Sequence, residues 1–178
     1  MEKTEILKRY FGHSEFRPGQ GEVIDHILSG QDCLGVMPTG AGKSMCYQIP
    51  ALMLGGTTIV ISPLISLMKD QVEGLQQSGV SAACINSSLS TAEYFSVLDR
   101  ASAGEYSIIY VAPERLSTEN FLEMCRNITI PLVAVDEAHC VSHWGQDFRP
   151  SYLKIAEFVQ SLPKRPVLAA FTATATDI

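Results

Sequence analysis

Short apolar runs alternate with amphipathic segments along most of this chain. Six runs of strand length are rich in aliphatic residues, at positions 33–37, 58–62, 82–85, 108–112, 132–135 and 167–171. The segments between them have helical spacing, at positions 44–54, 64–78, 91–102, 120–126 and 151–161. Near-continuous apolar strands separated by helices are typical of a parallel sheet covered on both faces. The pattern therefore predicts an α/β fold with a mostly parallel central sheet.

Two further helices are predicted before the first strand. Residues 6–11 have helical spacing and end at Gly12. Pro18, a good first-turn residue, is expected to start the second helix, whose apolar face runs from Val23 to Leu28.

The composition is that of one well-packed domain. The chain has 178 residues, of which 46% are hydrophobic, and its mean hydropathy is +0.13. No apolar run approaches the roughly 18–20 residues that span a membrane. The first five residues mix charges and lack the basic-then-apolar order of a signal peptide. We therefore expect a soluble protein, located in the cytoplasm and associated with the nucleoid if it is bacterial.

Cysteines and net charge exclude two simple classes of protein. The five cysteines are scattered, without a Cys-x-x-Cys pair, which favours reduced core thiols over zinc ligands or a disulfide framework. The net charge of −6 counts against an overall basic nucleic-acid-binding domain. It leaves a local groove open, because the distribution of charge matters more than the total.

Residues 37–44, Met-Pro-Thr-Gly-Ala-Gly-Lys-Ser, lie between a predicted strand and a predicted helix. A glycine-bearing turn that leads into a helix N-terminus points its backbone N–H groups at one spot, where a polyphosphate can bind. Lys43 would reach the β- and γ-phosphates, and Ser44 would offer its hydroxyl to Mg²⁺. The usual pattern has glycine where this chain has Met37. The departure indicates either an ordinary glycine turn or a subclass whose loop begins Pro-Thr-Gly.

An acidic pair, Asp136 and Glu137, follows the apolar strand at 132–135. A carboxylate at such a strand end can hold Mg²⁺, usually through water, and its neighbour can polarise a water for attack on the γ-phosphate. The alternative is two acids that cap the following turn. Ligands of parallel sheets bind beyond the carboxyl ends of the strands, where Lys43, this pair and Thr172 all fall.

Aromatic and basic side chains are concentrated in residues 142–150. Trp144, the only tryptophan, lies close to Phe148 and Arg149. Aromatics interleaved with cations suit stacking on single-stranded nucleic acid, and a hydrophobic anchor for the loop explains them equally well. Two strand-to-helix turns, at 62–67 and 112–115, could grip backbone phosphates or simply start helices.

Seven blocks of this sequence together resemble the first RecA-like lobe of a RecQ-family, superfamily-two DNA helicase. They lie at 11–20, 37–52, 62–72, 111–116, 136–140, 144–150 and 171–174, and correspond to motifs 0, I, Ia, Ib and II, the aromatic-rich loop and motif III. The resemblance implies that residues 1–178 form a three-layer RecA-like P-loop NTPase domain. It also implies that Met37 is the ordinary start of this family's phosphate loop.

The resemblance implies ATP and Mg²⁺ as cofactors and assigns a role to each site residue. Lys43, Asp136, Glu137 and His139 would be catalytic, and Ser44 and Asp136 would hold Mg²⁺, partly through water. The nucleotide-binding set would be His13, Arg17, Gln20, Thr39, Gly40, Ala41, Gly42, Lys43 and Ser44, with Gln20 reading the adenine edge and Arg17 stacking on the base. The set that couples DNA to ATP would be Ser62, Trp144, Phe148, Arg149, Thr172 and Thr174, with His139 linking the ATP site to the two threonines. Without this resemblance, Gln20 is better interpreted as a solvated helix residue and His139 as a packed histidine.

Nothing in the sequence matches the second lobe of such a helicase, which would supply arginine fingers. We therefore expect a fragment of a helicase that unwinds duplex DNA with 3′→5′ polarity and binds single-stranded and duplex DNA. The isolated chain should bind nucleotide but hydrolyse it feebly. The alternatives are a nucleotide- or DNA-binding module without helicase activity, and an RNA helicase lobe.

Overall fold

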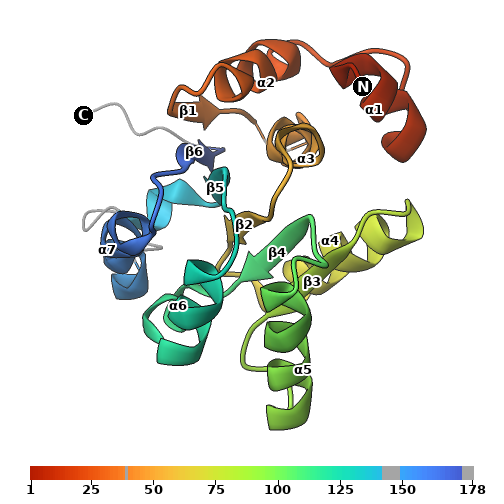
Figure 1. Cartoon of the computed structure of the whole chain (residues 1–178). Coiled ribbons are helices and arrows are strands. Elements are labelled where there is room, and N and C mark those ends of the chain that lie inside the picture. Colours follow the sequence, from red (N-terminus) through yellow and green to blue (C-terminus); the bar gives the residue numbers. More distant parts are fainter. Residues whose placement is uncertain (39, 142–148, 174–178) are drawn as a thin grey trace.

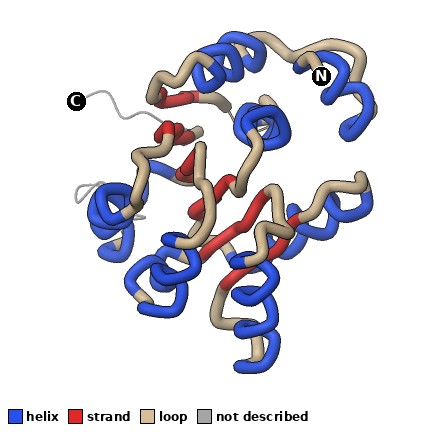
Figure 2. Tube along the Cα trace, viewed as in Figure 1, coloured by secondary structure: helices blue, strands red, loops and turns tan. Residues whose placement is uncertain are grey.

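Six short strands pair in parallel throughout one sheet, in the order β1-β6-β5-β2-β4-β3. The computed structural model shown in Figures 1 and 2 describes residues 1–38, 40–141 and 149–173. The strands are β1 (Cys33–Val36), β2 (Thr58–Ile61), β3 (Ala82–Ile85), β4 (Ile108–Val111), β5 (Leu132–Val135) and β6 (Val167–Thr172). Because all six run the same way, their carboxyl ends meet at one edge of the sheet.

Helices cover both faces of this sheet, which gives three layers. The α-helices are α1 (Lys3–Phe11), α2 (Gln20–Leu28), α3 (Lys43–Leu54), α4 (Ile65–Gln77), α5 (Thr91–Ser102), α6 (Glu119–Arg126) and α7 (Ile155–Ser161). Alternate residues of β2 point to opposite faces: Ile59 and Ile61 pack with α5, α6 and α7, whereas Val60 packs with α2, α3 and α4. The two cores explain why β2, β4 and β5 are buried at every position and are made almost entirely of apolar residues. The predicted α/β fold and its parallel sheet are confirmed.

The predicted strands agree with the structure to within one residue, and two helix predictions need correction. The second helix begins at Gln20, not at Pro18, because Gly19 adopts a left-handed φ of 85° and Arg17 and Gln20 close a turn. The segment predicted as one helix at 151–161 begins as a 3₁₀-helix, η3 (Pro150–Lys154), before α7. Two more 3₁₀-helices, η1 (Pro113–Ser117) and η2 (Ala138–Val141), gave no periodic signal because each spans barely one turn.

Strand β1 lies at an edge of the sheet and is held by β6 and by the loop before it. Asp32 accepts hydrogen bonds from the backbone N–H of Leu168 (2.9 Å) and from both terminal nitrogens of Arg165 (3.0 and 2.6 Å). The hydrogen bonds from Arg165, and then from Leu168, lower the pKa of the Asp32 carboxyl. Within the strand, Gly35 lies against the buried ring of Phe171. This close approach fixes β1 against β6 just before the chain turns toward α3.

None of the helices in the described ranges combines the length and the apolarity that crossing a membrane requires.

We expect Gly35→Ala to destabilise the fold. A Cβ at this position would lie 2.8 Å from Phe171 Cδ1, and the phenyl ring is fully buried. Overpacking of this kind costs about 1–3 kcal/mol of the free energy of unfolding, which urea denaturation would measure. The matched control is Gly74→Ala in α4, where nothing lies within 4 Å of the new Cβ. That change should stabilise the protein by about 0.5–1 kcal/mol, and equal effects of the two substitutions would contradict the packing argument.

Candidate functional site

The loop between β1 and α3 is shaped by two glycines. Gly40 and Gly42 have φ values of 84° and 79°, in the left-handed region that favours glycine. Helix α3 begins directly afterwards at Lys43, so the loop leads into the positive end of a helix dipole. The backbone that a phosphate cradle needs is therefore present. Thr39, also predicted to belong to this loop, lies outside the described residues.

Met37 is a core residue. Its side chain is 7% exposed, and the Cys46 thiol on α3 donates to its sulfur at 3.7 Å. Its backbone N–H donates to the carbonyl of Thr172 at the end of β6 (3.0 Å). The left-handed positions of this loop are Gly40 and Gly42, so position 37 does not need glycine and can pack the start of the loop onto α3.

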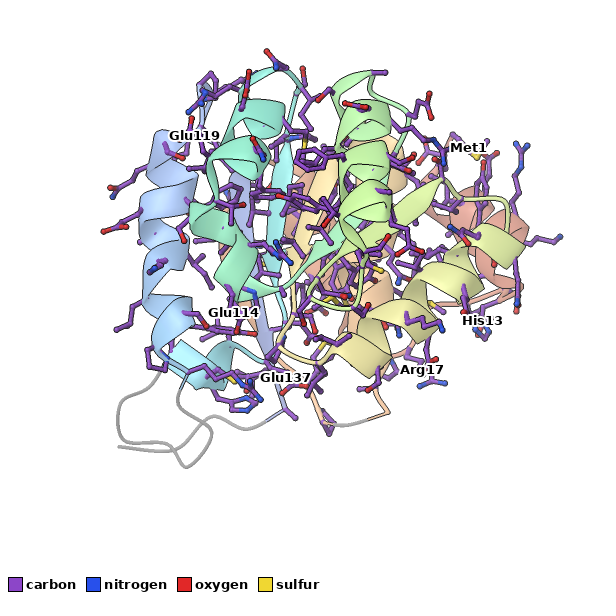
Figure 3. The ribbon with its side chains drawn as sticks, turned by 90° about the horizontal axis from the view of Figure 1, so that it is seen from below. Met1, His13, Arg17, Glu114, Glu119 and Glu137 are labelled. Carbon is purple, nitrogen blue, oxygen red and sulfur yellow. The ribbon has the colours of Figure 1, made fainter. Side chains whose placement is uncertain are left out.

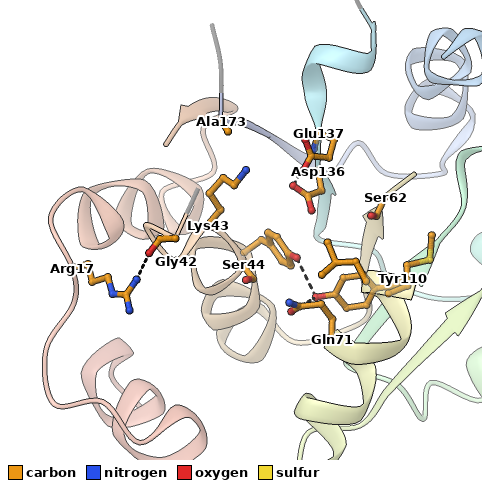
Figure 4. A pocket seen from close by; sticks show the side chains of 14 residues that line it. Arg17, Gly42, Lys43, Ser44, Ser62, Gln71, Tyr110, Asp136, Glu137 and Ala173 are labelled. Carbon is orange, nitrogen blue, oxygen red and sulfur yellow. Dashed lines mark hydrogen bonds between the residues drawn. The ribbon is translucent and has the colours of Figure 1, made fainter. Parts of the chain in front are cut away.

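The loop opens onto a cavity of about 550 Å³ at the carboxyl edge of the sheet. Figure 4 shows the Lys43 amine and the Asp136 carboxylate pointing toward one another across it. The lining residues are Arg17, Gly40, Gly42, Lys43, Ser44, Tyr47, Ser62, Leu67, Met68, Gln71, Tyr110, Asp136, Glu137 and Ala173. Figure 3 places Arg17 and Glu137 at this edge of the molecule and Glu119 at the opposite one. The cavity thus collects side chains from segments that are distant in the sequence.

Asp136 is held in place by its backbone and is electrostatically poised for a cation. Its N–H donates to the Ile61 carbonyl (2.8 Å), and its own carbonyl accepts from the Tyr152 hydroxyl (2.8 Å). Burial, and next the neighbouring Glu137, raise the pKa of the Asp136 carboxyl, although Lys43 opposes this shift. A buried carboxylate that nearby charges compensate only in part gains from a bound cation.

The residues around Asp136 fit a magnesium ion bound with a polyphosphate. Ser44 and Asp136 line the same cavity, and no group of three or more His, Cys, Asp or Glu able to hold a metal occurs among the described residues. Mg²⁺ typically takes one or two protein oxygens and completes its shell with phosphates and water. The sparse oxygen set matches that habit and argues against a metal caged by protein alone.

Glu137 and His139 continue from Asp136 in a strained turn. Glu137 is the one non-glycine residue with positive φ in the described part of the chain, at 53°, and its N–H donates to Asp136 Oδ1 (2.9 Å). His139 Nδ1 lies 3.1 Å from Thr172 Oγ1 and 3.4 Å from Glu137 Oε2. The histidine thus lies between the acidic pair after β5 and the end of β6. Its contact with Thr172 is the one that the resemblance implied. Thr174 lies outside the described residues.

The side chain of Gln20 packs against the phosphate loop. Its side chain is 2% exposed, its Oε1 accepts from the Arg17 N–H (2.8 Å), and its Nε2 donates to the carbonyls of Gly42 (3.0 Å) and Ala41 (3.4 Å). The interpretation of Gln20 as a solvated helix residue is therefore wrong. The Arg17 guanidinium donates to the Gly40 carbonyl and lines the cavity. His13 is exposed and is not among the residues that line the cavity.

The predicted DNA-coupling residues fall into two groups. Ser62 is 2% exposed and lines the cavity, and its hydroxyl accepts from the Leu64 N–H (3.5 Å), so it belongs to the cavity wall and not to the outer surface. Arg149 is exposed, and its N–H donates to the Cys140 carbonyl (2.9 Å), which brings it back beside η2. Trp144 and Phe148 lie outside the described residues.

Sequence reasoning missed six cavity residues, of which three carry polar groups: Tyr47, Gln71 and Tyr110. Tyr47 follows Lys43 by one helical turn, so its place in the cavity could have been found from the helical period. Gln71 falls within the matched block at 62–72 but is one of several polar residues on α4. Tyr110 reads as an ordinary member of an apolar strand, so nothing in its surroundings distinguished it.

We expect Asp136→Asn to raise the denaturation midpoint of the metal-free protein at neutral pH. The substitution removes a charge that burial disfavours and keeps an oxygen that can accept from the Glu137 N–H. Thermal unfolding with EDTA would measure the effect. The same variant should bind Mg²⁺–nucleotide more weakly than the wild type. A lower midpoint would show that the carboxylate stabilises the empty site.

Solved structures of helicases share this fold. A hypothetical ATP-dependent RNA helicase from Sulfolobus tokodaii matches 97% of this chain and 50% of its own, with a TM-score of 0.74 and 22% identity. The helicase Lhr of Mycobacterium smegmatis, solved with ssDNA and AMP-PNP, matches 96% of this chain and 24% of its own, with a TM-score of 0.72 and 19% identity. At these identities the likeness shows the fold alone, and it confirms the RecA-like helicase architecture.

Sequence comparison is more specific. The ATP-dependent DNA helicase RecQ of Bacillus subtilis is 52% identical over 96% of this chain, and that of Haemophilus influenzae is 48% identical over 96%. The chain spans only 29% and 27% of the lengths of these two relatives. The predicted resemblance to RecQ helicases is confirmed. The sequence model of the DEAD/DEAH box helicase family matches residues 17–178, so the chain belongs to that family.

Proposed function

We propose that this chain is the ATP-binding lobe of a RecQ-type, ATP-dependent DNA helicase. The observation that carries the proposal is the meeting of Lys43 and Asp136 across one cavity, with the glycine loop on one side of it and Glu137 on the other. The similarity to RecQ helicases supplies the reaction that such a cavity would serve. A location in the cytoplasm, at the nucleoid in a bacterium, belongs to the same proposal.

The chain's own residues divide the work of binding and hydrolysis. Lys43 and the N–H groups that begin α3 hold the β- and γ-phosphates. Ser44 and Asp136 hold Mg²⁺, which neutralises charge on the phosphates when it is bound. Glu137 accepts a proton from the attacking water, and its 3.4 Å contact with His139 keeps it oriented. Arg17 and Gln20 form the side of the site next to the loop, where the adenine would lie, and His13 belongs at its outer margin.

DNA binding and unwinding are further parts of the proposal. The exposed residues 64–66 that come after Ser62, the turn at 112–115 and the exposed Arg149 lie after strands at or near the edge that carries the cavity. These groups, with Trp144, Phe148, Thr172 and Thr174, would bind DNA and report its presence to Glu137 through His139. A second RecA-like lobe, outside the length that this chain spans in its relatives, would close over the nucleotide. Its arginine finger would contribute about 10³–10⁵ in rate, so this chain alone should hydrolyse ATP feebly.

Lys43→Ala should weaken the binding of a fluorescent ATP analogue with Mg²⁺ by about 10–100-fold, because it removes a charge-assisted contact worth about 1.5–3 kcal/mol. Fluorescence titration of this chain would measure the dissociation constant. The control is Lys164→Ala, an exposed lysine that does not line the cavity, and it should leave the constant unchanged. Equal binding by wild type and Lys43→Ala would place the nucleotide elsewhere.

Glu137→Gln should separate binding from hydrolysis. In a protein extended past Ile178, we expect DNA-stimulated ATP hydrolysis to fall by about 10²–10⁴-fold, as for loss of a general base, with nucleotide affinity kept within a few-fold. A phosphate-release assay with single-stranded DNA, with single-stranded RNA and without nucleic acid would measure it. Stimulation by RNA and not by DNA would favour an RNA helicase. No stimulation by either would leave a binding module.

A further inference from the structure

A hydrogen-bonded group of four polar side chains, three of them buried and the fourth half-buried, lies beside the nucleotide cavity. Tyr47 and Gln48 belong to α3, Gln71 to α4 and Tyr110 to β4. Gln48 Nε2 donates to Gln71 Oε1 (2.8 Å) and to the Tyr110 hydroxyl (2.9 Å), and the hydroxyls of Tyr47 and Tyr110 lie 3.1 Å apart. Figure 4 shows Tyr110 and Gln71 together on the side of the cavity away from Arg17. None of these four side chains has a part in the proposed binding or hydrolysis of the nucleotide.

Each member of the group is costly to bury unless its partners stay in place. Tyr47 and Tyr110 are 2% exposed and Gln48 is 4% exposed. Burial raises the pKa of both phenols, to about 12 for Tyr110, so both keep their hydroxyl protons at neutral pH. Gln48 uses both of its amide hydrogens within the group. Because a buried polar group that loses its partner is penalised, a shift of the buried Gln48 amide favours a matching shift of Gln71 and Tyr110, which accept its two hydrogens.

The group joins two segments that face different ligands. Gln48 lies just over one turn after Lys43 and Ser44, so it moves with the end of α3 that receives the phosphates. Gln71 lies in the second turn of α4, whose first turn follows Ser62. Three of the four residues also line the cavity itself. The Gln48–Gln71 bond is therefore a direct polar connection between the phosphate loop's helix and the helix that begins at the Ser62 turn.

We propose that Gln48 and Gln71 are positioning residues that transmit nucleotide binding at the phosphate loop to the first turn of α4. This inference rests on the proposed nucleotide site. When the loop and the start of α3 settle on the phosphates, Gln48 shifts with its helix. Gln71 follows, because its carbonyl is the acceptor of a buried N–H. The turn at Ser62, where the chain would meet DNA phosphates, is thereby ordered by the state of the nucleotide.

Hydrogen exchange measured by mass spectrometry tests this inference in the chain as it stands. The probe is ATPγS with Mg²⁺ at saturation, and the readout is the exchange rate of peptides that cover residues 62–70. We expect the nucleotide to slow this exchange by about fivefold in the wild type, a typical coupling between two sites. Gln71→Leu removes the acceptor at similar volume, so the slowing should fall to less than about twofold. A separate titration gives the ATPγS concentration that saturates each variant, so that exchange is compared at full occupancy.

Two variants separate lost coupling from a damaged fold. Gln71→Glu keeps an acceptor for the Gln48 amide and should restore the slowing at 62–70. Gln77→Leu makes the leucine substitution at an exposed position of the same helix and should behave as wild type. The proposed role of the Gln48–Gln71 connection would be overturned if exchange at 62–70 were still slowed in Gln71→Leu, or if Gln71→Glu failed to restore the slowing.

The test also separates this inference from the proposed function. A wild-type chain that binds ATPγS without any change at 62–70 would overturn the inference and leave the proposed nucleotide site intact. A wild-type chain that does not bind ATPγS would overturn the proposed site, and the inference with it.

Discussion

The parallel pairing of β1 with β6 is the contact on which the candidate site depends. Among the described residues β1 pairs with β6 alone, yet it leads into the loop that carries Lys43 and Ser44. Its register pairs Gly35 with Phe171 and Val36 with Thr172, and one step further Met37 donates to the Thr172 carbonyl. If β1 slipped by one residue, its side chains would exchange faces and the loop would leave Asp136. The close packing of Gly35 on Phe171 and the hydrogen bonds that Asp32 accepts both stabilise this register.

Charge in this protein is organised locally. The whole chain is acidic, yet the cavity places one lysine opposite an aspartate whose pKa is raised by burial. In the empty site the buried Asp136 charge is compensated only in part. An anion bound together with a cation would complete the compensation. The buried charge at Asp136 thus lowers the free energy of unfolding of the empty protein, and binding of the ligand would offset that loss.

Most of the fold could be predicted because its signals are local and repeated. Each strand is a run of aliphatic residues, and the end of β5 at Val135 coincides with the start of the acidic pair. Helix starts were less certain: Pro18 suits the first turn of a helix, but Gly19 follows it and takes a left-handed conformation that delays α2. The site was predictable where chemistry follows a strand directly, as at Lys43 and Asp136. It was not predictable where function depends on burial, which distinguishes Gln48 from other glutamines only after the helices have packed. Gln20 was assigned to the site by the resemblance and not by its local pattern.

The hydrogen bond from the Arg149 N–H to the Cys140 carbonyl has a consequence for energy as well as for shape. It fixes the two ends of the segment at 142–148 at neighbouring points, so the entropy of closing that loop is already spent in the folded protein. The bond ties Arg149 to η2, within a few residues of Glu137 and His139, so a force applied at Arg149 would act on the acidic turn and would not be dissipated along the chain.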